Sequence, residues 1–127
     1  MIAPTRVLVA DDEPLIRLLL RRAIERRPGL ELVGEAADGA EALDLAGALA
    51  PDVVVLDLSM PEPDGIAVTR RLRAAGRRCV ILIFSSSGGD EATVLEAGAD
   101  RFINKADGVD RVIDAVVALS AAPGSRD

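Results

Sequence analysis

The chain has 127 residues, half of them hydrophobic, which suffices for one domain with a single buried core. Its 21 acidic and 15 basic residues give a net charge of -6, which argues against binding to nucleic-acid phosphates. Histidine is absent, so histidine-ligated metals, histidine-based triads and a phosphohistidine on this chain are excluded.

Short apolar runs alternate along the chain with longer stretches in which apolar residues recur every three or four positions. This alternation is typical of βα units around a parallel sheet. The predicted strands are residues 6–10, 31–36, 53–58, 79–85 and 101–104. Polar positions in the second strand favour an edge, whereas the first, third and fourth strands are apolar enough to be central. The sequence predicts an α/β fold of five βα units with a doubly wound parallel sheet.

The segments between these strands contain residues that typically begin or end helices. We expect Asp12 to cap the first helix, with Pro14 in its first turn, and the helix to end before Pro28. Its predicted inward residues are Ile16, Leu19, Leu20, Ala23 and Ile24. The second helix is predicted to follow Asp38 and Gly39 and the third to span residues 66–75. We expect a short fourth helix after a Ser-Gly loop, whose high backbone entropy predicts mobility. The last helix carries the clearest apolar stripe, formed by Val109, Val112, Ile113, Val116 and Val117.

Polar side chains stand where four of the apolar runs stop. These residues are Asp11 with Asp12, Asp57, Ser85 and Lys105. Because open α/β sheets build their sites beyond the carboxyl ends of the strands, we expect these side chains to share one pocket. Clustered carboxylates repel one another unless a divalent cation and an ammonium offset their charge. The pocket composition predicts magnesium and phosphoryl chemistry.

Four motifs occur in order at the expected places: VLVADDEP, VVVLDLSMPEPDG, the serine that closes VILIFS, and GADRFINK. With these motifs, residues 6–119 resemble the receiver domains of two-component response regulators. The resemblance implies a flavodoxin-like sheet of strand order 2-1-3-4-5, which agrees with the edge position of the second strand. We expect a receiver domain over residues 5–120, followed by a flexible tail or the start of a linker over residues 121–127.

The resemblance also implies a role for each polar residue at the strand ends. Asp57 would accept the phosphoryl group, and Lys105 and Ser85 would bind its oxygens. Magnesium prefers about six oxygen ligands, and the protein share would come directly from the carboxylates of Asp12 and Asp57 and the carbonyl of Ser59, with Asp11 acting through a water.

Two further sets of residues are implied to control the phosphorylated state. Ser85 and Phe102 would couple phosphorylation to the surface of helix 4, strand 5 and helix 5. Ser59 and Ser87 would flank the approach of the hydrolytic water. Both are small, so we expect hydrolysis without strong obstruction.

The implied partners are a histidine kinase or a histidine phosphotransfer protein, together with an output partner that the sequence does not specify. A homodimer linked to phosphorylation is also compatible with the resemblance. We expect a signalling domain that catalyses its own phosphorylation and dephosphorylation, and not an enzyme acting on other substrates.

Two versions of the receiver remain open. The chain is either a stand-alone protein, which its length favours, or the receiver part of a DNA-binding regulator. Ala106 follows Lys105 where many receivers have proline, so we expect a trans peptide there. Receivers of LuxR-type regulators also commonly lack this proline, so the lysine loop resembles theirs. A magnesium-dependent phosphohydrolase with an aspartyl nucleophile is an alternative, but Ser59 stands where a second acid is usual. In a flavin-binding protein, Asp11 and Asp12 would repel the cofactor phosphate.

The remaining features of the sequence concern the cysteine, the cellular location of the protein and the character of its surface. Cys79 is the single cysteine and cannot form an internal disulfide. Apolar runs fall short of the roughly 20 residues that a membrane helix needs, so we expect a cytoplasmic protein without a membrane partner. Arginines at residues 17–27 and 70–78 have helical spacing, which favours solvated helix faces over a protein-docking surface.

Overall fold

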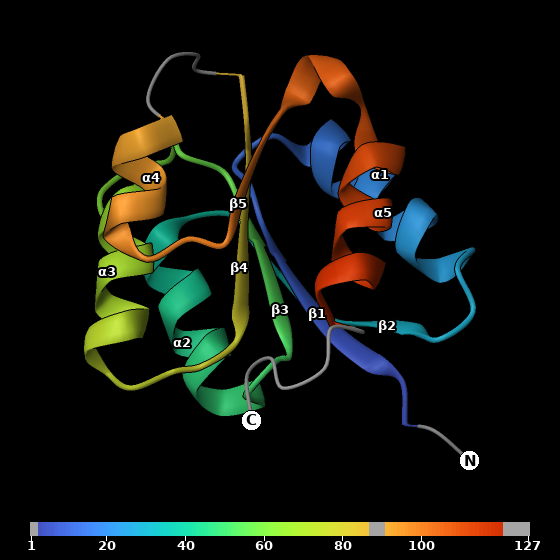
Figure 1. Cartoon of the computed structure of the whole chain (residues 1–127), viewed down its shortest axis with the longest axis horizontal. Coiled ribbons are helices and arrows are strands. Elements are labelled where there is room, and N and C mark those ends of the chain that lie inside the picture. The colour runs from blue at the N-terminus through green and yellow to red at the C-terminus, as the bar shows by residue number, and fades with distance from the viewer. Residues whose placement is uncertain (1–2, 87–90, 121–127) are drawn as a thin grey trace.

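The computed structural model describes residues 3–86 and 91–120, which form a five-stranded parallel sheet with helices on both faces (Figure 1). The strand order is β2-β1-β3-β4-β5, so the predicted order and the edge position of the second strand are confirmed. The strands are β1 (Thr5–Ala10), β2 (Leu30–Ala36), β3 (Val53–Leu56), β4 (Val80–Ser85) and β5 (Arg101–Asn104). The helices are α1 (Pro14–Glu25), α2 (Gly39–Leu49), α3 (Gly65–Ala74), α4 (Glu91–Ala97), the 3-10 helix η1 (Lys105–Asp107) and α5 (Val109–Ser120).

Two apolar cores lie on opposite faces of the sheet, because successive side chains of a strand point to opposite sides. Helices α1 and α5 cover one face, and α2, α3 and α4 cover the other (Figure 1). In β1, for example, Val7 and Val9 belong to the first core, and Leu8 and Ala10 belong to the second. Strands buried on both faces explain why the central runs of the sequence are continuously apolar.

The start of α1 differs from the prediction, because Glu13 and not Asp12 occupies its N-cap position. Pro14 is the first helical residue, and a residue before proline is held in extended conformation, as the angles of Glu13 are (φ -90°, ψ 113°). Asp12 therefore lies outside the helix. By contrast, α2 and α3 are capped by aspartates whose side chains accept backbone N–H bonds, Asp38 from Glu41 (2.8 Å) and Asp64 from Ala67 (2.9 Å).

Several boundaries and faces also differ in detail. β3 ends at Leu56, two residues earlier than predicted, and a register shift between Val7 and Leu8 interrupts the pairing of β1 with β2. Leu19 was expected to face inward but is 41% exposed, because it lies with Leu15 at the edge of the apolar stripe. Among the described residues, Glu62–Pro63 has the cis peptide bond, and the Lys105–Ala106 bond is trans as expected. None of the described helices is long and apolar enough to cross a membrane.

Two glycines let the loop after β3 pack closely against its surroundings. A Cβ atom at Gly65 would overlap the backbone carbonyl oxygen of Asp57, and one at Gly39 would overlap that of Pro63. A side chain at either position would therefore push the loop that follows Asp57 out of place. These close approaches constrain the path of the loop that follows β3.

Two glycines of α2 offer a matched test of this packing. We expect Gly39→Ala to lower the free energy of unfolding by about 1–3 kcal/mol, because the new methyl group meets rigid backbone. Gly47→Ala lies on the same helix, where the nearest atom is Arg77 Nη2 at 3.7 Å, and it should raise that free energy by about 0.5–1 kcal/mol. Urea denaturation measures both, and equal effects would contradict the close approach.

Candidate functional site

The ends of β1 and β3 place two aspartates side by side at one edge of the sheet. Ala10 is paired with Leu56, and the backbone N–H of Asp57 donates to Ala10 O at 3.0 Å. The N–H of Asp11 in turn donates to Ala36 O of β2, also at 3.0 Å. The sheet pairing thus extends one residue beyond the strands and leaves both aspartates only 2% exposed. Their positions are set by backbone bonds and not by side-chain preference.

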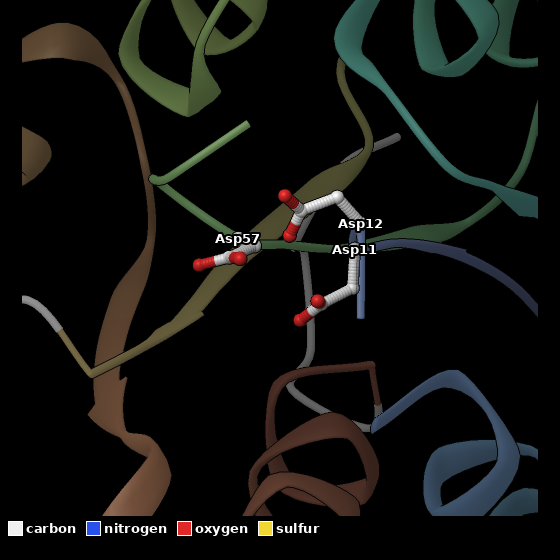
Figure 2. Close-up of side chains that lie close together, drawn as sticks. All are labelled: Asp11, Asp12 and Asp57. Atoms are coloured by element: carbon white, nitrogen blue, oxygen red, sulfur yellow. The ribbon is translucent and has the colours of Figure 1, made fainter. Parts of the chain in front are cut away.

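Asp11, Asp12 and Asp57 form a carboxylate cluster. One oxygen from each of the three lies within 4.8 Å of the others. Figure 2 shows the side chains of Asp11 and Asp12 coming from the end of β1 and that of Asp57 from the end of β3. Asp12 is exposed whereas the other two are buried, so the cluster reaches solvent on the side of Asp12. Hard oxygen donors in this arrangement suit a magnesium ion.

Lys105 follows β5 and neutralises part of this charge. Its ammonium Nζ lies 2.9 Å from Asp11 Oδ2, 3.2 Å from Asp57 Oδ2 and 2.6 Å from Glu13 Oε1. The side chain of Asn104 accepts the N–H of Ala106 at 2.9 Å and caps the η1 turn on which Lys105 sits. The predicted convergence of Lys105 with the aspartates is therefore present.

The electrostatics of the site show incomplete compensation. Burial raises the pKa of Asp11 and the charge of Asp57 adds to the rise, against the N–H of Glu13 and the ammonium of Lys105. Burial acts to lower the pKa of Lys105, but its bonds to Glu13 and Asp11 and the charge of Asp57 outweigh burial and raise it. The ammonium stays charged at neutral pH, yet it faces several carboxylates. A divalent cation would remove the remaining repulsion.

Both carboxylate oxygens of Asp57 have donors. Oδ2 contacts Lys105, and Oδ1 accepts the backbone N–H of Ser59 at 3.3 Å. Ser59 lies two residues after Asp57 in the loop that follows β3, and it is exposed. Ser87 lies outside the described residues.

Ser85 and Phe102 lie on neighbouring strands. Ile83 of β4 pairs with Phe102 of β5, and Ser85 is two residues further along β4. The alternation of a strand therefore directs Ser85 and Phe102 to the same face of the sheet. Ser85 is fully buried, and Phe102 is half-buried against the core beneath α2, α3 and α4. The sheet thus connects the end of β4 to the α4 side of β5.

Sequence reasoning overlooked three residues of the site. Glu13 contacts Lys105, Asn104 caps the lysine turn, and the guanidinium of Arg17 donates to Asp11 O at 2.7 Å. Glu13 is a third acidic residue directly after Asp11 and Asp12, so the sequence did contain a signal for it. Nothing in the sequence pattern pointed to Arg17. The solvated-face interpretation is also too simple for this helix, because Arg21 Nε binds Glu35 Oε2 at 2.7 Å.

Comparison with known proteins gives a consistent result. The family model of the response regulator receiver domain matches residues 7–117. The nitrate/nitrite response regulator protein NarP of Escherichia coli is 38% identical over 125 residues, which are 97% of this chain and 57% of NarP. A protein-glutamate methylesterase/protein-glutamine glutaminase of Myxococcus xanthus is 40% identical over 108 residues, 83% of this chain and 31% of that protein.

A solved structure matches over nearly its whole length. The signal receiver domain of the putative response regulator NarL from Mycobacterium tuberculosis has a TM-score of 0.89 and 34% identity, covering 94% of this chain and 98% of that one. The chain therefore belongs to the response regulator receiver domain family, and it is a receiver of two-component signalling with the flavodoxin-like fold. It spans 57% and 31% of the two curated relatives named above, which are longer proteins.

The charge imbalance predicts a stability change. We expect Asp11→Asn to raise the free energy of unfolding in metal-free buffer by about 1 kcal/mol, because it removes a buried charge and keeps an acceptor for Glu13 N–H. Because the pKa of Asp11 is higher in the folded than in the unfolded state, this charge destabilises wild type increasingly as the pH rises. The gain should therefore shrink on acidification, where Asp11 is protonated.

Chemical denaturation at several pH values measures this difference. Asp44→Asn on the exposed side of α2 is the control and should change stability by less than about 0.5 kcal/mol. A loss of stability in Asp11→Asn at neutral pH would show that the carboxylate cluster is not strained.

Proposed function

We propose that residues 5–120 act as a phosphoacceptor domain in which Asp57 receives a phosphoryl group from a histidine kinase or a histidine phosphotransfer protein. The observation that carries this proposal is the position of Asp57, with the Lys105 ammonium 3.2 Å from Oδ2 and the Asp11 and Asp12 carboxylates beside it. A carboxylate is a weak nucleophile, so the rate must come from in-line positioning and from charge compensation. Because this chain lacks histidine, the phosphohistidine belongs to the partner.

The phosphoryl transfer is a substitution at the phosphorus atom. An oxygen of Asp57 attacks the phosphorus of the partner's phosphohistidine, a P–O bond forms as the P–N bond breaks, and the imidazole nitrogen keeps the electron pair. Lys105 donates a hydrogen bond to a phosphoryl oxygen, and Ser85 binds another. The buried position of Asp57 keeps its carboxylate in one orientation while its two existing donors hold it.

The donor set fits Mg2+, which the carboxylates of Asp11, Asp12 and Asp57 and the carbonyl of Ser59 would hold. When bound, the ion supplies positive charge next to the equatorial phosphoryl oxygens. Asp11 and Asp12 would hold such an ion together with Asp57, and the exposed side chain of Asp12 leaves this side of the cluster open to solvent.

We assign the switch to Ser85 and Phe102, with the surface of α4, β5 and α5 as the output face. Their location on one sheet face and on neighbouring strands supports this coupling. Leu95 on α4 is 41% exposed and offers this face an apolar contact for an output partner or for a second copy after phosphorylation. Ser59, which is small and exposed, leaves the hydrolytic water an open path, and Ser87 is assigned the same part from the sequence alone.

We place this signalling reaction in the cytoplasm, and we assign no catalysis on other substrates. Residues 121–127 would be a tail or the first part of a linker. The alternative version is the receiver part of a DNA-binding regulator, in which this receiver would control an attached output domain; the curated relative NarP is longer than this chain, which covers 57% of it. A phosphohydrolase is less well supported, because Ser59 replaces the second acid.

Intact mass after incubation with phosphoramidate and Mg2+ tests the acceptor. We expect wild type and Asp44→Asn to gain one phosphoryl group, and Asp57→Asn to gain none because its amide lacks the nucleophilic oxygen anion. Lys105→Ala should react about 100-fold more slowly, through loss of a charge that stabilises the transition state.

Chelation of Mg2+ should slow the wild-type reaction as well. A phosphoryl adduct on Asp57→Asn equal to that on wild type would remove the assigned acceptor. Release of phosphate from a small monoester at a sustained rate would favour the phosphohydrolase.

A further inference from the structure

Lys105 is the only lysine of this chain, and its ammonium is already fully used. An ammonium has three N–H donors. In the structure three carboxylates surround it, with Glu13 Oε1 at 2.6 Å, Asp11 Oδ2 at 2.9 Å and Asp57 Oδ2 at 3.2 Å. The shortest of these contacts is made to Glu13 and the longest to Asp57. A phosphoryl oxygen on Asp57 can gain a donor from Lys105 only if one of these contacts is given up.

The three carboxylates differ in how easily they can leave. The side chain of Asp11 is 2% exposed, and its other oxygen accepts the N–H of Glu13 at 2.8 Å, so it is fixed. The side chain of Asp57 is 3% exposed and is itself the proposed acceptor. The side chain of Glu13 is 58% exposed and is free to turn into water. Glu13 is therefore the contact that gives way.

We propose that Glu13 is a positioning residue that holds Lys105 in the unphosphorylated state and is displaced from it when a phosphoryl group arrives on Asp57. The inference rests on the proposed roles of Asp57 and Lys105. A dianionic phosphoryl group carries more charge than a carboxylate, so it competes successfully for the ammonium. Release of Glu13 breaks its exposed ion pair with Lys105. The free-energy cost of breaking this pair lowers the rate of phosphorylation.

Removal of the negative charge at Glu13 should therefore speed phosphorylation. For Glu13→Gln we expect a rate with phosphoramidate and Mg2+ about two- to fivefold above wild type, as suits the strength of an exposed ion pair. The half-saturating concentration of beryllofluoride, a phosphoryl analogue, should fall by the same factor. Glu25→Gln, at the far end of the same helix, is the matched control and should match wild type.

A double mutant separates this role from simple repulsion of the anionic donor. If Glu13 acts through Lys105, Glu13→Gln should have no effect in a Lys105→Met background. If Glu13 only repels anions, the acceleration should persist in that background and the proposal is overturned.

The single lysine also provides a direct spectroscopic measurement. With 15N-labelled lysine, Nζ gives one resonance, which should differ between wild type and Glu13→Gln before beryllofluoride is added. At saturating beryllofluoride and Mg2+ the two resonances should coincide, because Glu13 has left in wild type. A difference that persists at saturation would show that Glu13 stays bound and would overturn the proposal.

The outcomes also separate this inference from the proposed function. Equal or slower phosphorylation of Glu13→Gln, with the adduct still on Asp57, would contradict the proposed role of Glu13 and leave the assigned acceptor unaffected. An adduct that forms on Asp57→Asn would instead remove the acceptor on which the inference rests.

Discussion

The site depends on mutual repulsion between carboxylates that the sheet forces together. Backbone hydrogen bonds of β1 with β2 and of β3 with β1 set Asp11 and Asp57 at adjacent strand ends, where neither can move away without loss of sheet pairing. Lys105 offsets only part of this charge. A protein that needed stability alone would place neutral residues here, so the uncompensated charge indicates a site built for a cation and an anionic group.

The rest of the fold supports this strained edge. Gly39 and Gly65 allow the loop after Asp57 to pack closely against backbone, which constrains the position of Asp57. The apolar cores on both sides of the sheet supply the stability that the charged edge lacks. The pairing of β4 with β5 then links the end of β4 to the surface near α4, so that a change at the charged edge has a short structural path to the exterior.

Much of this was predictable from the sequence, for identifiable reasons. Central parallel strands are buried on both faces, so their apolar runs stand out, and polar residues at their ends must converge. The cap at Asp12 was mispredicted because Pro14 imposes the boundary on Glu13. Leu19 follows the apolar periodicity of α1 and is nevertheless 41% exposed, because periodicity does not reveal how wide a stripe of the helix is covered. The contact of Glu13 with Lys105 joins residues 92 positions apart through an exposed side chain, and only the packed structure brings them together.

Thermal unfolding at increasing Mg2+ tests most directly the claim that a cation relieves the repulsion of the carboxylates. The account predicts that the Tm of wild type rises with Mg2+ and that the stabilisation reaches about 2.7 kcal/mol when the free ion is at 100 times its Kd. Asp12→Asn, which alters an exposed side chain of the cluster, should gain far less at the same concentrations. An unchanged Tm in wild type, or an equal rise in both proteins, would contradict the account.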